Sequence, residues 1–289
     1  MTPAASGAAG SFDSSHGRVK PDESVTLSGR FAVPQTASAE AGGKGDQKSD
    51  AAVQGVRIQF RANGAENWHD AERTRTGRNG KFSERVPVER SGRFRAVSED
   101  GRATPAEYVR VKSVTRARVA DKLVKQGDTV AIKGHVEPAG KRKVKVRVGG
   151  ETLKTRTSKG GGFKVQWEAG TTGEETVRVR AESDRIAAGS ADKAGKVAVL
   201  RPALASWYGG SLIGNGVACG GTLQADTIGV AHKSLPCGTK LIVAYKGRSV
   251  KTEVIDRGPY SGNREFDLTQ GLKEKLNFDV GVGTVYVSK

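Results

Sequence analysis

An aspartate at the end of an apolar, β-branched run is the residue of this sequence best suited to chemistry. Asp256 follows Val254 and Ile255 and precedes Arg257. A carboxyl group that ends a buried strand is partly desolvated, and desolvation moves a carboxyl group toward the proton affinity that a general acid needs. The alternative is that Asp256 pairs with Arg257 or with a backbone amide and only fixes the turn.

Two further side chains could act with this carboxyl group. His232 lies in an Ala-His-Lys-Ser-Leu-Pro segment, where a neutral imidazole could orient the acid or hold a hydroxyl group. The alternative for His232 is a structural hydrogen bond to a backbone carbonyl. Asp267, in Phe-Asp-Leu-Thr, is the third candidate, but the start of a helix there would explain it as an N-cap.

Four segments of the last third of the chain share their order and spacing with a known family. They are Ala205–Gly209 (ASWYG), Gly229–Lys240 (GVAHKSLPCGTK), Val254–Tyr260 (VIDRGPY) and Phe266–Thr269 (FDLT). In these segments the chain resembles the RlpA family of double-psi β-barrel domains, which bind or cleave bacterial peptidoglycan, and more distantly the expansins. The resemblance implies that Asp256 takes part in glycan cleavage, that His232 lines the same groove, and that Asp267 also occupies a family position.

Aromatic and polar residues near these motifs are candidates for sugar binding. Tyr208 and Tyr260 could stack on the C–H faces of sugar rings, although aromatic residues in a small barrel usually belong to its core. Asn215 and Arg257 are further candidates for polar contacts with a glycan. Trp207 is a weaker candidate.

One loop departs from the family pattern. Many RlpA sequences carry a Glu and an Asp upstream of the histidine, where this chain has Gly221 and Gln224. A glycosidase normally needs two carboxyl groups. A lytic transglycosylase can use one, which protonates the leaving oxygen and then accepts the proton of the MurNAc 6-hydroxyl. The expected activity is therefore a lytic transglycosylase that uses Asp256, or binding without cleavage.

Both cysteines of the chain lie in this same region. Cys219 and Cys237 are close in sequence in an otherwise cysteine-free chain, which favours a disulfide formed in an oxidising compartment. Two free thiols, or a zinc site that adds His232, are the alternatives, and no fourth zinc ligand is evident. We expect no metal and no cofactor.

The elements that must position these residues are short strands and one helix. Strands are expected at Lys240–Tyr245, Ser249–Ile255 and Gly283–Val287. A helix should follow, capped by Asp267 or Thr269, with Leu272 and Leu276 pointing inward and an end at Asn277.

The first two thirds of the chain contain an internal repeat. Each copy alternates apolar and polar residues with period two and has glycine-containing turns, as antiparallel sandwiches do. Trp68 and Trp167 are expected in the cores, Gln35 to Ala52 as a flexible loop, and Ile186 to Lys196 as a loose segment. The matched segments are Val25–Gly29 with Val130–Gly134, Val56–Phe60 with Val144–Val148, Thr74–Phe82 with Thr155–Phe163, and Arg93–Ala96 with Arg178–Ala181.

These patterns predict a mainly all-β chain. Two immunoglobulin-like β-sandwiches, without the cysteine pairs of antibody domains, should precede a six-stranded double-psi β-barrel with one short helix. The expected divisions are a disordered segment at 1–20, sandwiches at 21–114 and 115–200, and the barrel at 201–289.

Charge points to an anionic partner. The chain has a net charge of +17, of which residues 201–289 contribute +4 and the first 200 residues +13. The basic residues are spread along strand-like segments and form no nucleic-acid-binding motif, so an acidic wall polymer is favoured over nucleic acid. No apolar run is long enough to span a membrane. We see no signal peptide and expect an exported cell-wall protein whose export signal is absent from this sequence.

Overall fold

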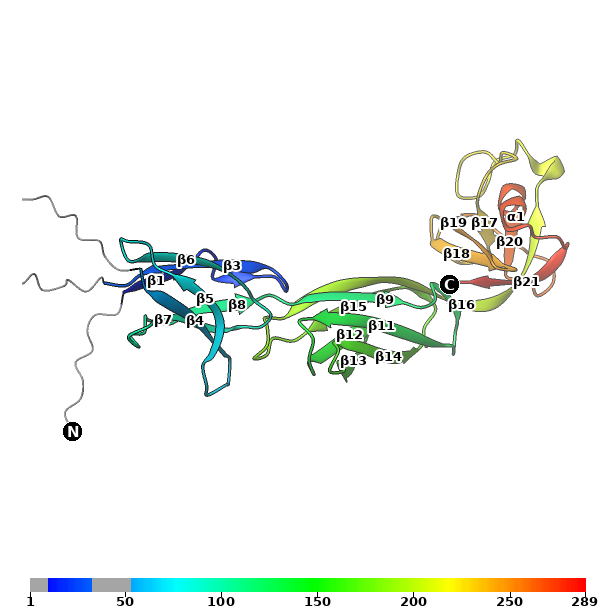
Figure 1. The fold of residues 1–289 in the computed structure, drawn as a ribbon. Coiled ribbons are helices and arrows are strands. Elements are labelled where there is room, and N and C mark those ends of the chain that lie inside the picture. The colour runs from blue at the N-terminus through cyan, green and yellow to red at the C-terminus, as the bar shows by residue number, and fades with distance from the viewer. Residues whose placement is uncertain (1–9, 33–52) are drawn as a thin grey trace, which may run out of the picture.

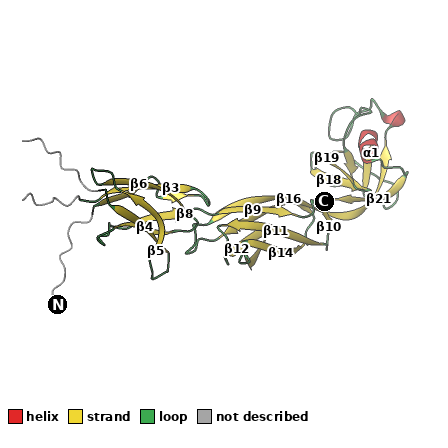
Figure 2. Cartoon of the chain, viewed as in Figure 1, coloured by secondary structure: helices red, strands yellow, loops and turns green. Residues whose placement is uncertain are grey.

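The computed structural model describes residues 10–32 and 53–289. Within them the chain is built almost entirely of strands, with one α-helix in the last part (Figure 2). Two sandwiches and a barrel follow one another in a row, with the barrel at the end opposite the first sandwich (Figure 1). The predicted all-β class is confirmed. The loop expected at 35–52 and the start of the segment expected to be disordered lie outside the described residues.

The first sandwich packs a three-stranded sheet, β1-β3-β6, against a five-stranded sheet, β2-β8-β7-β4-β5. Disorder was wrongly expected as far as residue 20, because Phe12 and Val19 are buried in this core, and Phe12 stacks on Phe82. The strands are β1 (Ser11–Ser14), β2 (Arg18–Val19), β3 (Ser24–Arg30), β4 (Gly55–Ala62), β5 (His69–Arg75), β6 (Lys81–Pro87), β7 (Gly92–Ser98) and β8 (Glu107–Val111).

The second sandwich repeats this arrangement with β14-β11-β9 facing β13-β12-β15-β16. The matched sequence segments fall on equivalent strands of the two units, so the repeat is structural. The strands are β9 (Val114–Val119), β10 (Leu123–Lys125), β11 (Thr129–Glu137), β12 (Lys143–Val148), β13 (Glu151–Arg156), β14 (Gly162–Glu168), β15 (Gly173–Ala181) and β16 (Ser190–Tyr208).

A glycine opposite a phenylalanine is repeated in the two sandwiches. Gly134 on β11 pairs with Phe163 on β14, as Gly29 pairs with Phe82 in the first unit. A Cβ atom on Gly134 would come within 2.5 Å of the Phe163 ring and 2.6 Å of the Arg116 carbonyl oxygen. The aromatic ring therefore covers the glycine backbone, and a side chain there would displace it.

We expect Gly134→Ala to destabilise the second sandwich by about 1–3 kcal/mol, because the added methyl group overpacks a filled site. Calorimetric unfolding of both proteins would measure the loss. Gly170→Ala is the matched control, since a Cβ at Gly170 meets no atom within 4 Å. Equal melting temperatures for the two variants would contradict the proposed packing constraint.

The two sandwiches meet through a short segment around Ala187, here called the wedge, which the sequence did not reveal. Ala187 lies between β15 and β16 of the second sandwich, yet it is 1% exposed and belongs to the core of the first. Backbone hydrogen bonds from Ser91 N–H to the Ile186 carbonyl and from Ala188 N–H to the Val111 carbonyl hold it there. The loose segment expected from Ile186 to Lys196 is therefore wrong: its start is this wedge and its remainder belongs to β16.

The predicted positions of the two sandwich tryptophans were half correct. Trp167 is 2% exposed and lies in the second core, as expected. Trp68 lies outside the first core, on the outer face of the sheet, with the guanidinium groups of Arg61 and Arg95 at 4.7 and 4.3 Å from its ring centroid. The alternation of residues near Trp68 did not show this, because Trp68 precedes β5 rather than lying within it.

The barrel is closed by six strands in the order β16-β20-β17-β19-β18-β21, and β21 returns to β16. Its core is formed by residues such as Val230, Val254 and Phe266. The predicted strands and helix are confirmed to within a residue at each end. The remaining elements are η1 (Gly210–Leu212), β17 (Val230–His232), β18 (Lys240–Tyr245), β19 (Arg248–Asp256), β20 (Phe266–Thr269), α1 (Gln270–Leu276) and β21 (Val282–Val287).

One strand joins the second sandwich to the barrel without a linker. The first part of β16 pairs with β15 and β10 as far as Leu200, and the part from Arg201 pairs with β21. Ala198 and Leu200 pack against Ile242 of the barrel. The Lys251 ammonium group also bonds the Glu174 carboxylate at 2.6 Å across the junction. The barrel is therefore carried on the sandwich by a continuous backbone and a small apolar contact.

Candidate functional site

Strand register brings two aspartates to one region of the barrel. Ala231 on β17 pairs with Asp256 at the end of β19 and with Asp267 on β20. Paired residues of neighbouring strands project to the same face of a sheet. Ala231 therefore lies between the two aspartates in the register of the sheet.

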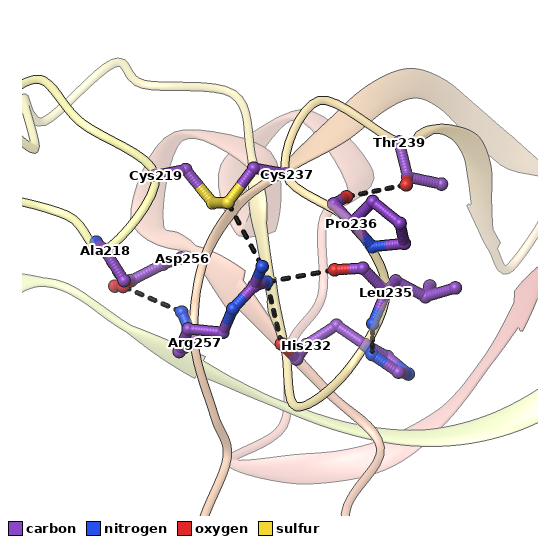
Figure 3. The surroundings of a disulfide bond; sticks show 9 residues. All are labelled: Ala218, Cys219, His232, Leu235, Pro236, Cys237, Thr239, Asp256 and Arg257. Carbon is purple, nitrogen blue, oxygen red and sulfur yellow. Dashed lines mark hydrogen bonds between the residues drawn. A yellow bond between two sulfur atoms is a disulfide. The ribbon is translucent and has the colours of Figure 1, made fainter.

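Asp256 is held by backbone amides at one of its two oxygens. Its Oδ1 accepts hydrogen bonds from the Ala218 N–H at 2.9 Å and the Arg257 N–H at 2.8 Å (Figure 3). The loop that lacks the expected acid thus supplies a backbone donor to Asp256. The carboxyl group is half-buried, and no hydrogen bond within the described part of the chain occupies Oδ2 with good geometry. The backbone amides therefore fix the carboxyl group through Oδ1 and leave Oδ2 without an amide donor.

A disulfide fixes the loop that carries Ala218. Cys219 and Cys237 are joined, with their Cα atoms 5.5 Å apart, which confirms the disulfide and removes the zinc alternative because the thiols are used up. The Cys219 N–H also donates to the Ile255 carbonyl, directly before Asp256. The disulfide therefore ties the amide donor of Asp256 to the segment that follows His232.

Arg257 serves as a brace for that same segment. Its guanidinium group donates to the carbonyl of Leu235 at 3.0 Å, to that of His232 at 3.3 Å, and to Cys237 Sγ at 3.2 Å (Figure 3). These bonds occupy the guanidinium group within the protein. Arg257 therefore orders the loop beside Asp256, and its expected role in sugar binding remains a prediction.

Tyr208 interacts electrostatically with both aspartates. Burial raises the pKa of its hydroxyl above the usual value, and the charge of Asp256, a hydrogen-bonding interaction with it and the charge of Asp267 add to this effect. The hydroxyl stays protonated, so it is a hydrogen-bond donor at physiological pH. It is buried and has no protein partner of good hydrogen-bond geometry in the described residues. In this position the Tyr208 hydroxyl can donate a hydrogen bond to the Asp256 carboxylate or to a hydroxyl group of a ligand.

Asp267 does not cap the helix. Thr269 is the N-cap, with its side-chain oxygen accepting from the Leu272 N–H, and Asn277 ends the helix in the left-handed conformation. Asp267 lies inside β20 and bonds the hydroxyl of Ser206, which also accepts from Arg264. The sequence missed Ser206, since only the pairing of β16 with β20 brings it to Asp267, and it missed Arg264, which acts through Ser206.

His232 interacts with a carboxylate that the sequence did not indicate. Its Nδ1 accepts the backbone N–H groups of Ser234 and Leu235 at 3.1 and 3.0 Å, so the neutral ring carries its proton on Nε2. Nε2 lies 3.7 Å from Glu265 Oε1, and Glu265 is bound by both terminal nitrogens of the Arg201 guanidinium group. The ring packs on Phe266 with centroids 4.8 Å apart. His232 is thus held as a neutral ring beside the Arg201–Glu265 ion pair, with Nε2 facing Glu265.

This environment predicts a loss of stability in mild acid. Desolvation lowers the pKa of His232, partly opposed by Glu265, so the unfolded chain binds this proton more readily than the folded one. Stability should therefore decline as the pH falls below about 6.5, the pKa of an unperturbed histidine. The pKa of Glu265 is also lowered, chiefly by its hydrogen bond from Arg201. The stability that this ion pair contributes is therefore lost at a still lower pH, where Glu265 becomes protonated.

Urea unfolding of the barrel at several pH values between about 7.5 and about 5.5 would measure this decline. His232→Asn keeps a side-chain acceptor for the two amides but does not titrate. Its stability should vary less with pH over this interval. A wild-type and variant pair with the same pH dependence would show that His232 is not the titrating group.

The other candidate residues lie at the surface. Tyr260 is 77% exposed and follows the Asp256 turn, and Asn215 is exposed in the loop after η1. Trp207 is 37% exposed, and the Lys273 ammonium group lies 4.1 Å from its ring centroid. The structure joins Asp256, Tyr208 and Asp267 electrostatically. Asn215 and Tyr260 are exposed, and their side chains have no hydrogen bond to another of the described residues.

The family match falls on the barrel. A family described as lytic transglycolase matches residues 202–288. A probable endolytic peptidoglycan transglycosylase RlpA of Synechocystis is 34% identical over 97 residues, which is 32% of this chain and 30% of that protein. The endolytic peptidoglycan transglycosylase RlpA of Neisseria meningitidis is 39% identical over 85 residues, 29% of this chain and 35% of its own length. The chain thus spans about a third of the length of these relatives.

Solved structures resemble the chain only weakly. A Streptomyces papain inhibitor is 26% identical, covering 30% of this chain and 89% of its own, at a TM-score of 0.25. The Yersinia pseudotuberculosis adhesin InvE is 9% identical over 66% of this chain and 58% of its own, at a TM-score of 0.35. Similarities of this size do not bear on function.

The six-stranded closure, the aspartate at the end of β19 and the family match define a double-psi β-barrel domain. More particularly, residues 202–288 form an RlpA-like barrel, as the sequence motifs predicted. No helix of the described residues has the length and apolar composition needed to cross a membrane.

Proposed function

We propose that the barrel binds and cleaves peptidoglycan glycan strands as a lytic transglycosylase, in a protein that works outside the cell at the wall. The observation that carries this proposal is the environment of Asp256. One oxygen of its carboxyl group is held by two amides and the other has no hydrogen bond of good geometry in the described residues, in a domain that matches the lytic transglycosylase family. The relatives are named as peptidoglycan transglycosylases, which supports the substrate class.

A single carboxyl group balances this reaction. Protonated Asp256 gives its proton to the glycosidic oxygen as the bond to MurNAc C1 breaks. The resulting carboxylate accepts the proton of the MurNAc 6-hydroxyl, whose oxygen bonds to C1 and closes the 1,6-anhydro ring. No water is consumed, and Asp256 ends in its starting state. Tyr208 would hold the carboxylate or a sugar hydroxyl by donating its proton in a hydrogen bond, and neutral His232 would help to shape the groove.

The alternative is a binding or expansin-like module that releases no product. Gly221 and Gln224 replace the acids of the usual loop, and Ser206 engages Asp267. A second open carboxylate is therefore lacking at the positions where the family pattern would place one, which disfavours hydrolysis by two carboxyl groups. A wall-facing part of a larger surface assembly is a further candidate, which size-exclusion chromatography would reveal as a species larger than the monomer.

Digestion of purified peptidoglycan followed by mass spectrometry tests the proposal. A lytic transglycosylase releases muropeptides that are one water lighter than the products of a hydrolase. Sedimentation of the protein with insoluble sacculi measures binding in the same samples. Binding without soluble products would overturn the enzymatic proposal and favour the binding module.

The two sandwiches are proposed to hold the protein on anionic wall polymer. The support is their share of the charge, +13 of the total +17 in the first 200 residues. Such binding should weaken as salt rises, because salt screens exposed charges.

A further inference from the structure

Basic residues form a row directly across three strands of the second sandwich. Lys145 on β12 pairs with Lys154 on β13 at one side and with Arg180 on β15 at the other. All three residues are exposed on the outer face of the sheet. Their partners on the inner face, such as Val144 and Val146, form the core. The row is thus not required to build the sandwich.

The rows on both sides of this one are also basic. Arg147 pairs with Arg178 on β15, which in turn pairs with Lys193 on β16. On the other side, Lys143 pairs with Arg156. We call this surface the cation grid, and its residues are Lys143, Lys145, Arg147, Lys154, Arg156, Arg178, Arg180 and Lys193.

The cation grid is poorly neutralised within the protein. Glu182 lies beside it and bonds Lys145 at 2.7 Å. Glu174 lies farther along β15, where it is bound by Lys196 and Lys251. Like charges placed directly opposite one another destabilise a sheet. An arrangement that costs stability over three consecutive rows indicates an anionic partner.

The spacing of the grid defines the kind of anion. Basic residues alternate along β12 at Lys143, Lys145 and Arg147, so successive charges are separated by two residues, which is six backbone bonds and roughly 6.8 Å of extended chain. Consecutive phosphates of 1,3-linked poly(glycerol phosphate) are also separated by a repeat of six backbone bonds. An extended polymer lying along the strands would therefore present one phosphate to every row, and neighbouring strands about 4.8 Å away would contact the same phosphate.

A nucleic-acid strand has the same number of backbone bonds per phosphate, but its bases favour a different surface. Proteins that bind single strands place aromatic side chains under the bases. On β12, β13, β15 and the sandwich part of β16, all within the described chain, no outward-facing residue is aromatic. We therefore propose that the cation grid binds a linear polyanion without bases, a poly(glycerol phosphate) chain running along the strands. This inference deepens the proposed attachment of the sandwiches to wall polymer and rests on it.

The opposite face of the same sandwich offers a matched control. There Lys133 on β11 pairs with Lys164 on β14 and with Arg118 on β9. The neighbouring row does not continue the pattern, since Arg116 is bound to Glu137 at 3.0 Å. This single row carries the same charge as the central row of the grid, but it is not flanked by an unneutralised basic row on each side.

Binding of the full chain to soluble, lipid-free poly(glycerol phosphate) tests the proposal by titration calorimetry. The grid variant is Lys145→Gln/Lys154→Gln/Arg180→Gln, and the control variant is Arg118→Gln/Lys133→Gln/Lys164→Gln. We expect the grid variant to bind at least about tenfold more weakly, with the slope of log affinity against log salt reduced by about 0.7, because the central row no longer neutralises the one phosphate that faces it. The control should change affinity much less, although its net charge is the same. Circular dichroism would verify that both variants fold.

Two results would overturn the proposal. Equal losses in the two variants would show that net charge, not the grid, governs binding. Tighter binding of a single-stranded DNA oligomer with the same number of phosphates, lost in the grid variant, would make the grid a nucleic-acid surface.

Digestion of peptidoglycan stripped of its polymer separates this test from the proposed enzyme function. The grid variant should cleave stripped glycan like the wild type, whereas failure of both to cleave it would count against the enzyme alone.

Discussion

Replacement of Asp256 by asparagine should abolish the release of anhydro-muropeptides while leaving the barrel folded and able to bind glycan. The asparagine Oδ1 can still accept the N–H groups of Ala218 and Arg257, at 2.9 and 2.8 Å in the present structure. The amide cannot exchange the proton that the reaction needs. Loss of a general acid and base typically costs about 10²–10⁴-fold in rate, and since one group performs both steps here, we expect at least the upper end.

Product release measured by mass spectrometry, with sacculus binding measured by sedimentation, would check this expectation. Asp226→Asn is the matched control, because it makes the same chemical change at an exposed position of the same domain. Full activity of Asp256→Asn would place the acid elsewhere, and Asp267→Asn would be the next variant to assay. Loss of binding together with activity would instead assign Asp256 a role in holding the glycan.

The site was predictable from sequence where local pattern determines position. An apolar, β-branched run followed by Asp256 and a Gly-Pro turn predicts a carboxyl group at a strand end, which β19 confirms. The two cysteines were close enough in sequence for a disulfide to be expected, and the structure joins them. In these cases the deciding contacts lie within a short stretch of chain or between its only two cysteines.

The partners of the site residues were not predictable, because strand pairing across the barrel sets them. Glu265 meets His232 and Arg201, residues that lie more than thirty positions earlier in the sequence. Asp267 could equally have been a helix cap, and its bond to Ser206 follows only from the register of β16 with β20. Period-two alternation shows which face a residue occupies but not which residue of another strand lies opposite.

The same limit applies to the way the sandwiches join. Alternation and the repeat revealed two similar sheets, whereas the wedge at Ala187 breaks the repeat and fills the core of the neighbouring domain. Arg142, in a run of basic residues that looks exposed, is 1% exposed in the structure. Burial of one cation among several can be recognised only when its partners are known.

Replacement of Arg142 by leucine should destabilise the sandwiches by about 2–3 kcal/mol, because buried acceptors lose a charged hydrogen-bond donor. The guanidinium group bonds the Asp184 carboxylate at 2.7 Å and the carbonyls of Glu182 and Ala187, each at 3.1 Å. Leucine would leave the buried Ala187 carbonyl without this donor, whereas the Asp184 carboxylate is 31% exposed and can be hydrated. Because one of these acceptors is the carbonyl of Ala187, which lies in the wedge between the sandwiches, the contact between the sandwiches should weaken as well.

Differential scanning calorimetry of the full chain suits this test, since several domains unfold and a single two-state fit is not justified. The transition of the sandwiches should move to lower temperature, while that of the barrel, whose core is separate, should stay. Arg116→Leu is the control, because its pair with Glu137 is 71% exposed on the arginine side and should contribute at most about 1 kcal/mol. If Arg142→Leu cost no more than this control, desolvation of the buried guanidinium group would offset its bonds, and apolar packing around Ala187 would be what holds the two sandwiches together.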